Sequence, residues 1–189
     1  MLQAASVALI LLASAMSLSC DPDWVFVGVY DLQGDYVRVF PGRSGLQVFV
    51  FMREDCPISN RYAPELNRLH EDFGDKAKFF LVYPDPQAAA DSIEAHRAEY
   101  LLAMPALIDS DHLLVDYSGV RTTPEVAVYR DHHRIYRGRI DDRFVAFGKE
   151  RAAPTTRDLH DVLTALLAGD DPAPYETEAV GCYIQDLRP

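Results

Sequence analysis

The chain has 189 residues, of which 49% are hydrophobic, and a formal net charge of −11. This length and composition predict one domain with a sizeable buried core, and the acidic charge argues against nucleic acid as a partner. The three cysteines do not form a CxxC pair or another zinc-like spacing, so we expect neither a metal ion nor a cofactor.

The first 20 residues are typical of a secretory signal peptide. Residues 4–16 form an apolar run, and small residues precede Cys20. The run is short for a membrane span, which needs about 20 apolar residues. Cys20 resembles the lipobox cysteine of bacterial lipoproteins, although Ser17 stands where Leu is usual and no Lys or Arg precedes the run. We therefore expect an exported protein, periplasmic or held at the membrane only by this signal or by a lipid on Cys20, in a compartment where disulfides form. Acylation of Cys20 stays open.

The next segment predicts an N-terminal β-hairpin. Residues 24–30 and 36–40 alternate in the manner of strands and are joined by a turn at 32–35. A Pro- and Gly-rich loop at 41–45 follows.

Cys56 lies where a predicted strand ends and a predicted helix begins. The apolar run 46–51 precedes it, Pro57 suits a first helical turn, and the helix is indicated by Tyr62, Leu66, Leu69 and Phe73. A thiol at a helix N-terminus faces free N–H groups and the positive end of the helix dipole, which favour the reactive thiolate. The alternative is that Cys56 is a small buried apolar residue, but its position at a strand–helix junction favours a chemical role.

Further strands and helices alternate along the chain. Residues 78–83 form a nearly continuous apolar run, as in a strand covered on both faces. A helix is predicted at 87–102, then a strand at 106–109 and a short helix ending near Gly119. Thr123 and Pro124 precede the predicted strands 125–129 and 134–139, and residues 159–167 carry the apolar face of a last helix.

The strand, Cys-Pro-x-Ser and helix, together with Thr123-Pro124 before a strand, resemble the thioredoxin superfamily over residues 24–169. Within it the chain is most similar to the redoxin group related to alkyl hydroperoxide reductase and thiol-specific antioxidant (AhpC/TSA) proteins. The resemblance implies an α/β thioredoxin-like fold, with a central mixed sheet flanked by helices and an N-terminal β-hairpin extension. It also implies that Pro124 is cis and lies against Cys56.

The chain departs from the family patterns at three positions. A thioredoxin would carry a second cysteine where this chain has Ser59. A typical peroxiredoxin would carry Thr and Pro where this chain has Arg53 and Phe49. The resemblance therefore implies the fold more closely than it implies either activity.

Residues 170–189 form a C-terminal tail rich in Pro, Asp and Glu, a composition commonly found in disordered segments. An apolar patch around Cys182 interrupts it. We hypothesise that Cys182 is the resolving partner that Ser59 cannot be, because two thiols in an oxidising compartment pair where geometry allows. The alternatives are that Cys182 packs or pairs with another chain.

Several charged and polar residues are weaker candidates. Arg53 and Arg61 flank Cys56 and could favour its thiolate, whereas Asp55 opposes it. His96 and His112 flank the segment predicted to pass near the cysteine loop, and packing is the competing interpretation of both.

The preferred hypothesis is an exported thiol oxidoreductase with Cys56, Pro57, Pro124 and Cys182 as its site. It would reduce a peroxide or exchange a disulfide, with a thiol reductant as the second partner. One alternative is a catalytically weak thioredoxin-fold module that docks to a redox or electron-transport protein. Another is a copper-binding chaperone of the SCO type, although Asn60 stands where that type has its second cysteine.

Overall fold

Strand β3 (Leu46–Phe51) lies at the centre of the sheet and feeds helix α1 (Pro57–Phe73). The computed structural model describes residues 27–40 and 45–185. The expected signal segment and Cys20 lie outside these residues. Side chains of β3 alternate between two cores: Val48 and Val50 pack on one face of the sheet, and Phe49 and Phe51 on the other.

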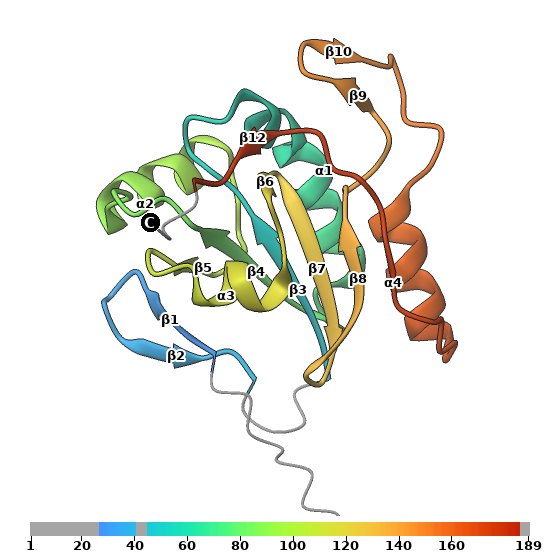
Figure 1. Cartoon of the computed structure of the whole chain (residues 1–189), viewed down its shortest axis with the longest axis horizontal. Coiled ribbons are helices and arrows are strands. Elements are labelled where there is room, and N and C mark those ends of the chain that lie inside the picture. Colours follow the sequence, from blue (N-terminus) through green and yellow to red (C-terminus); the bar gives the residue numbers. More distant parts are fainter. Residues whose placement is uncertain (1–26, 41–44, 186–189) are drawn as a thin grey trace, which may run out of the picture.

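In the described part of the chain, eight strands form one mixed sheet in the order β11-β8-β7-β3-β4-β5-β1-β2 (Figure 1). The β3–β4, β4–β5 and β8–β11 pairs are parallel and the others antiparallel. The remaining strands of this sheet are β1 (Gly28–Asp31), β2 (Tyr36–Arg38), β4 (Lys78–Tyr83), β5 (Ala106–Ile108), β7 (Glu125–Arg130), β8 (His133–Gly138) and β11 (Tyr175–Glu176). Two short pairs lie outside it: β9 (Phe144–Ala146) with β10 (Lys149–Glu150), and β6 (Thr122–Thr123) with β12 (Cys182–Tyr183). The mixed sheet and the β1–β2 hairpin confirm the predicted thioredoxin-like arrangement.

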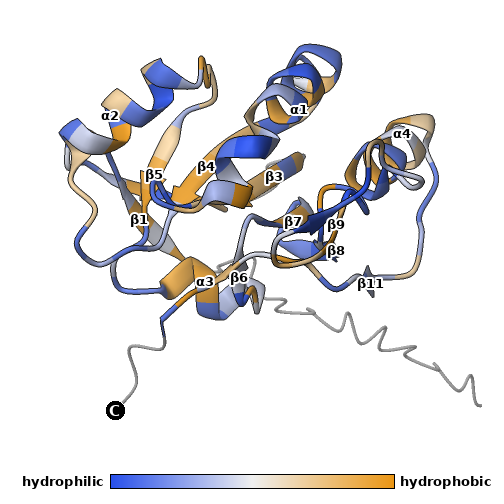
Figure 2. Ribbon diagram, turned by 90° about the horizontal axis from the view of Figure 1, so that it is seen from above, coloured by the Kyte–Doolittle hydropathy of each residue, from blue (hydrophilic) through white to orange (hydrophobic). Residues whose placement is uncertain are grey.

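Helices cover both faces of the sheet. Figure 2 shows α1 and α4 (Asp158–Ala168) on one side and α3 (Leu113–Ser118) on the other. Helix α2 (Ala90–Glu99) joins the core of α1 through Ile93. None of the helices in the described part is both long and apolar enough to cross a membrane.

Helix α1 is held by the apolar stripe that its sequence predicts. The predicted stripe residues Tyr62, Leu66, Leu69 and Phe73 are all buried in one core, together with Ile58. Burial of a large apolar side chain contributes about 1.5–3 kcal/mol. The stripe therefore fixes the N-terminus of α1, and with it Cys56, relative to β3.

Helix α2 is shorter than the predicted range 87–102. At its start, Asp85 accepts hydrogen bonds from the backbone N–H groups of Gln87 (2.9 Å) and Ala88 (3.1 Å), which holds these residues in a turn. At its end, Leu101 adopts a left-handed conformation with φ of 56°, which stops the helix.

Candidate active site around Cys56 and Cys182

Cys56 is the N-cap residue of α1, and Pro57 occupies the first turn, as the sequence predicts. The Cys56 backbone N–H donates to Arg53 O (3.3 Å), and Asn60 N–H donates to Cys56 O (3.1 Å). The Cys56 side chain is completely buried. Its thiol is therefore held at the start of the helix with little freedom to move.

The Thr123–Pro124 peptide bond is cis, which confirms the prediction for Pro124. Its segment lies directly against the thiol, because Cys56 Sγ donates a hydrogen bond to Thr123 O at 3.0 Å. The two halves of the predicted motif, which are 67 positions apart, thus meet at one carbonyl oxygen.

The tail brings Cys182 to the same place. Strand β12 pairs antiparallel with β6, so that Cys182 lies opposite Thr123, and Figure 1 shows β12 beside β6 and the start of α1. Ile184 N–H donates to Arg121 O (3.0 Å), and Thr123 Oγ1 donates to Cys182 O (3.4 Å). The disordered character expected of the tail is wrong for residues 175–176 and 182–183, because the sheet and the β6 edge provide partners for their backbone groups.

Gly181 allows this close approach. A Cβ atom at this position would lie 2.2 Å from Thr123 O and 2.7 Å from Thr123 C. These contacts are too short for any side chain, and the atoms that Cβ would meet are backbone atoms next to Pro124. Glycine is thus required for packing here.

The two thiols are free and influence each other's ionisation. Burial raises the pKa of Cys56, but hydrogen bonds from the Cys182 thiol and from Ser59 outweigh burial, so the pKa lies below its ordinary value. Burial, followed by the neighbouring Cys56 sulfur, raises the pKa of Cys182 to about 12. Cys56 is therefore the thiol that ionises more readily, and Cys182 is the thiol that stabilises its ionised form.

Neither Arg53 nor Arg61 is among the main groups that shift the pKa of the Cys56 thiol. Arg53 forms ion pairs with Asp55 (3.0 Å) and Asp85 (3.2 Å), and Arg61 pairs with Glu150 (2.6 Å). The lowered pKa of Cys56 arises from hydrogen bonds of neutral groups, and Asp55 acts instead by raising the pKa of Cys182.

Ser59 is a site residue that the sequence interpretation missed. The sequence shows it only as a departure from a two-cysteine motif, yet it is fully buried, and both its hydroxyl and its backbone N–H lower the pKa of Cys56. In the thiol form its Oγ has no hydrogen-bond partner among the described residues, so it is available to the thiolate. The signal that could have identified it is its spacing, because residue N3 of a helix faces the N-cap side chain.

His96 is connected by hydrogen bonds to the loop that precedes Cys56. Its Nε2 donates to Asn60 Oδ1 (2.9 Å), since the Asn60 amide group donates to Glu54 O (2.9 Å), and its Nδ1 accepts from the Tyr83 hydroxyl (2.9 Å). Burial lowers the pKa of His96, which keeps the ring neutral. His112 is buried elsewhere, with Nε2 donating to Pro84 O (2.7 Å). Both histidines have packing and hydrogen-bonding roles.

The described residues contain no group of three or more His, Cys, Asp or Glu side chains that could hold a metal ion. The copper-chaperone alternative therefore gains no support from the geometry around Cys56.

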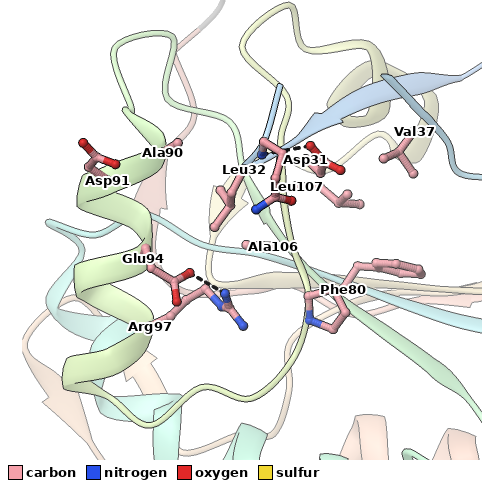
Figure 3. A pocket seen from close by; sticks show the side chains of 12 residues that line it. Asp31, Leu32, Val37, Phe80, Ala90, Asp91, Glu94, Arg97, Ala106 and Leu107 are labelled. Carbon is pink, nitrogen blue, oxygen red and sulfur yellow. Dashed lines mark hydrogen bonds and ion pairs between the residues drawn. The ribbon is translucent and has the colours of Figure 1, made fainter. Parts of the chain in front are cut away.

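The large cavity in Figure 3, of about 550 Å³, lies away from the cysteines. It is lined by Asp31 and Leu32 after β1, by Glu94 and Arg97 of α2, and by residues of β4 and β5, and includes neither thiol. Glu94 and Arg97 form an ion pair with each other across one turn of α2 (2.6 Å). Nothing in this cavity bears on the chemistry of Cys56.

Comparisons with solved structures identify the fold of the chain. The chain resembles a hypothetical protein from Sinorhizobium meliloti (22% identity, TM-score 0.71, covering 85% of this chain and 90% of that one). It also resembles a secreted Mycobacterium tuberculosis disulfide oxidoreductase homologous to E. coli DsbE (18% identity, TM-score 0.52, 76% and 95% covered). A third similar structure is the pneumococcal exposed lipoprotein thioredoxin of Streptococcus pneumoniae (15% identity, TM-score 0.53, 76% and 99% covered). At these identities the similarity establishes a shared thioredoxin-like fold.

No curated protein matches the chain. A family match covers residues 29–141, which include β3, Cys56, α1 and the cis-proline segment. The chain belongs to the AhpC/TSA family.

Proposed function

We propose that the chain is an exported thiol–disulfide oxidoreductase in which Cys56 is the nucleophile and Cys182 the resolving thiol. One observation carries the proposal: β12 places Cys182 opposite Thr123, the residue whose carbonyl oxygen accepts the Cys56 thiol hydrogen. Two free thiols with opposite pKa shifts at one backbone position have the division of labour that a dithiol cycle needs.

The cycle balances as a two-electron exchange. The Cys56 thiolate attacks a substrate disulfide, forms a mixed disulfide and releases one substrate thiolate, which takes up a proton. Cys182 then attacks the Cys56 sulfur, which forms the Cys56–Cys182 disulfide and releases the second substrate thiolate, and the Cys182 proton passes to that thiolate. The substrate is reduced and the protein oxidised, and an external thiol reductant restores both cysteines.

A disulfide substrate fits the surroundings of Cys56 better than a peroxide. Cleavage of an O–O bond expels a strongly basic oxygen anion, which needs a cation or strong donor beside it. Arg53 and Arg61 are instead paired with carboxylates. A thiolate leaving group is far less basic. The donors around Cys56 are a thiol, a hydroxyl and two backbone N–H groups, which suit sulfur chemistry.

The amino-terminal sequence supports export. Residues 4–16 and Cys20 have the composition of a secretory or lipoprotein signal. Two similar structures are of a secreted disulfide oxidoreductase and an exposed lipoprotein thioredoxin. An oxidising compartment would supply disulfide substrates.

The test is peptide mapping of the Cys20→Ser protein after exposure to oxidised glutathione or to hydrogen peroxide. We expect oxidised glutathione to give the Cys56–Cys182 disulfide. With Cys182→Ser added, Cys56 should retain a stable mixed disulfide with glutathione, and with Cys56→Ser added, Cys182 should stay largely free. Faster oxidation by peroxide than by glutathione disulfide would instead make the protein a thiol peroxidase. A folded protein whose thiols both stay free would favour the docking module.

A further inference from the structure

The tail reaches Cys182 through three successive attachments. Near its start, Arg130 forms an ion pair with Asp171 (2.8 Å) and donates to Asp170 O (3.0 Å). Strand β11 then pairs in parallel with β8. Finally β12 pairs with β6 over two residues, with one further hydrogen bond from Ile184 N–H to Arg121 O, and Tyr183 there is 82% exposed. The last attachment is small, so the position of Cys182 depends on the one before it.

Glu176 is the charged anchor of the middle attachment. Its Oε1 lies 2.5 Å from Arg134 Nη2, and its Oε2 pairs with Arg137 Nη2. The other terminal nitrogens of the two arginines donate to Ser118 O and Gly119 O at the end of α3. One carboxylate thus joins the tail to β8 and, through the arginines, to α3.

Arg137 also connects this anchor to the cis-proline segment. Its Nε lies 3.8 Å from Oε1 of Glu125, the residue that follows Pro124. Glu125 Oε2 in turn accepts the backbone N–H groups of Arg121 (2.8 Å) and Thr122 (3.2 Å). These belong to the edge that receives β12, so a single charge network touches both the tail and the edge on which it docks.

Glu176 also lies within short reach of the thiol. The next residue, Thr177, is fixed by its N–H to Arg137 O (3.0 Å) and by its hydroxyl to the Tyr136 hydroxyl (2.6 Å). The five residues from there to Cys182 span at most about 17 Å when extended. A fixed point this close keeps the effective concentration of Cys182 at Cys56 high, whereas release of Glu176 and Thr177 together from β8 would leave a much longer tether.

Resting on the proposed function, we propose that Glu176 is a positioning residue for the resolving step: its ion pairs with Arg134 and Arg137 hold the tail so that Cys182 stays opposite Thr123. Glu176 touches neither thiol and acts through the tail. Because its side chain is 46% exposed, its ion pairs have a small effect on global stability and a larger effect on where the tail lies.

The experiment compares Glu176→Gln with Glu178→Gln in the full chain carrying Cys20→Ser. Both variants remove one negative charge from the tail, but Glu178 is exposed and forms no ion pair among the described residues. The equilibrium constant of the Cys56–Cys182 disulfide is measured in glutathione redox buffers. We expect Glu176→Gln to lower it about 3- to 10-fold and to speed alkylation of Cys56 by iodoacetamide. Glu178→Gln should stay within about twofold of the parent on both measures.

Salt provides a test that does not depend on a variant folding. Raising NaCl to about 1 M should lower the disulfide equilibrium constant of the parent toward that of Glu176→Gln and leave the variant nearly unchanged. Three results would each overturn the positioning role while the dithiol cycle stands. They are equal disulfide equilibrium constants for Glu176→Gln and the parent, a parent constant that does not change with salt, and an equal effect of Glu178→Gln. A parent that forms no Cys56–Cys182 disulfide in any buffer would remove both proposals.

Discussion

At the scale of single residues, the reactivity of Cys56 depends on neutral donors that outweigh its burial. A buried thiol without partners has a raised pKa, yet that of Cys56 is lowered, because the Cys182 thiol and the Ser59 hydroxyl both favour the thiolate. Ser59 thus does part of what a nearby cation does at other activated cysteines. Its hydroxyl also cannot form a disulfide, which is why the proposed cycle assigns the resolving role to Cys182.

We predict that Ser59→Ala raises the apparent pKa of Cys56, since it removes a hydroxyl–thiolate hydrogen bond that contributes about 1–1.5 kcal/mol. The measurement is the pH dependence of iodoacetamide alkylation in the Cys20→Ser, Cys182→Ser background, where Cys56 is the remaining thiol. Ser110→Ala, outside the site, serves as the control. An alkylation profile that does not move on loss of the Ser59 hydroxyl would mean that the helix terminus alone sets the pKa.

At the scale of elements, the strand–helix junction and the cis-proline segment could be predicted from the sequence because each carries a local signal. The run 46–51 and the stripe on α1 have the periods of a strand and a helix, and Cys56 lies between them. The place of β12 carries no such signal. It is two residues long, and its partner Thr123 lies 59 positions earlier in the chain, so its pairing depends on where the rest of the fold puts an open edge.

We predict that Gly181→Ala detaches β12 from β6. The new Cβ would overlap Thr123 O, and neither the cis-proline segment nor the tail backbone can yield cheaply. The Cys56–Cys182 disulfide equilibrium constant should fall by at least about tenfold, and Cys56 should be alkylated faster. The equilibrium constant is measured in glutathione buffers and the alkylation rate with iodoacetamide, each in the Cys20→Ser protein.

The matched control for this prediction is Gly74→Ala. Its Cβ would lie 2.5 Å from His70 O at the far end of α1, so it creates a similar backbone overlap away from the cysteines. It should lower the thermal unfolding midpoint without changing the disulfide equilibrium. If Gly181→Ala leaves disulfide formation intact, the tail reaches Cys56 by a route that does not need this contact.

At the scale of the whole molecule, two cores on opposite faces of the sheet must stay in register for the site to form. The core around α1 positions Cys56, whereas the core around α3 supports the segment that leads to Thr123. Helix α3 is short, and Asp109 fixes its start: the carboxylate accepts the backbone N–H groups of Leu114 (3.1 Å) and Val115 (2.8 Å). Asp109 is buried inside the fold, where its oxygens reach these donors.

The buried position of Asp109 makes stability depend on pH. Burial raises its pKa to about 6, against the hydrogen bonds from Val115 and Leu114 and the nearby His112, which lower it. The folded protein therefore keeps a proton that the unfolded chain loses near pH 4, so this contribution to stability is present at low pH and is lost as pH rises from about 4 to 6. Ionised Asp109 then costs about 3 kcal/mol relative to its neutral form.

We predict that Asp109→Asn removes this dependence, because the amide oxygen still accepts from the start of α3 and carries no charge. The measurement is the free energy of unfolding in urea for the parent and Asp109→Asn from pH 4 to pH 7. Other groups titrate alike in both proteins and cancel in the difference, so the variant should gain up to about 3 kcal/mol relative to the parent across that range. A difference that stays constant from pH 4 to 7 would show that Asp109 is ionised throughout, and that the helix donors outweigh its burial.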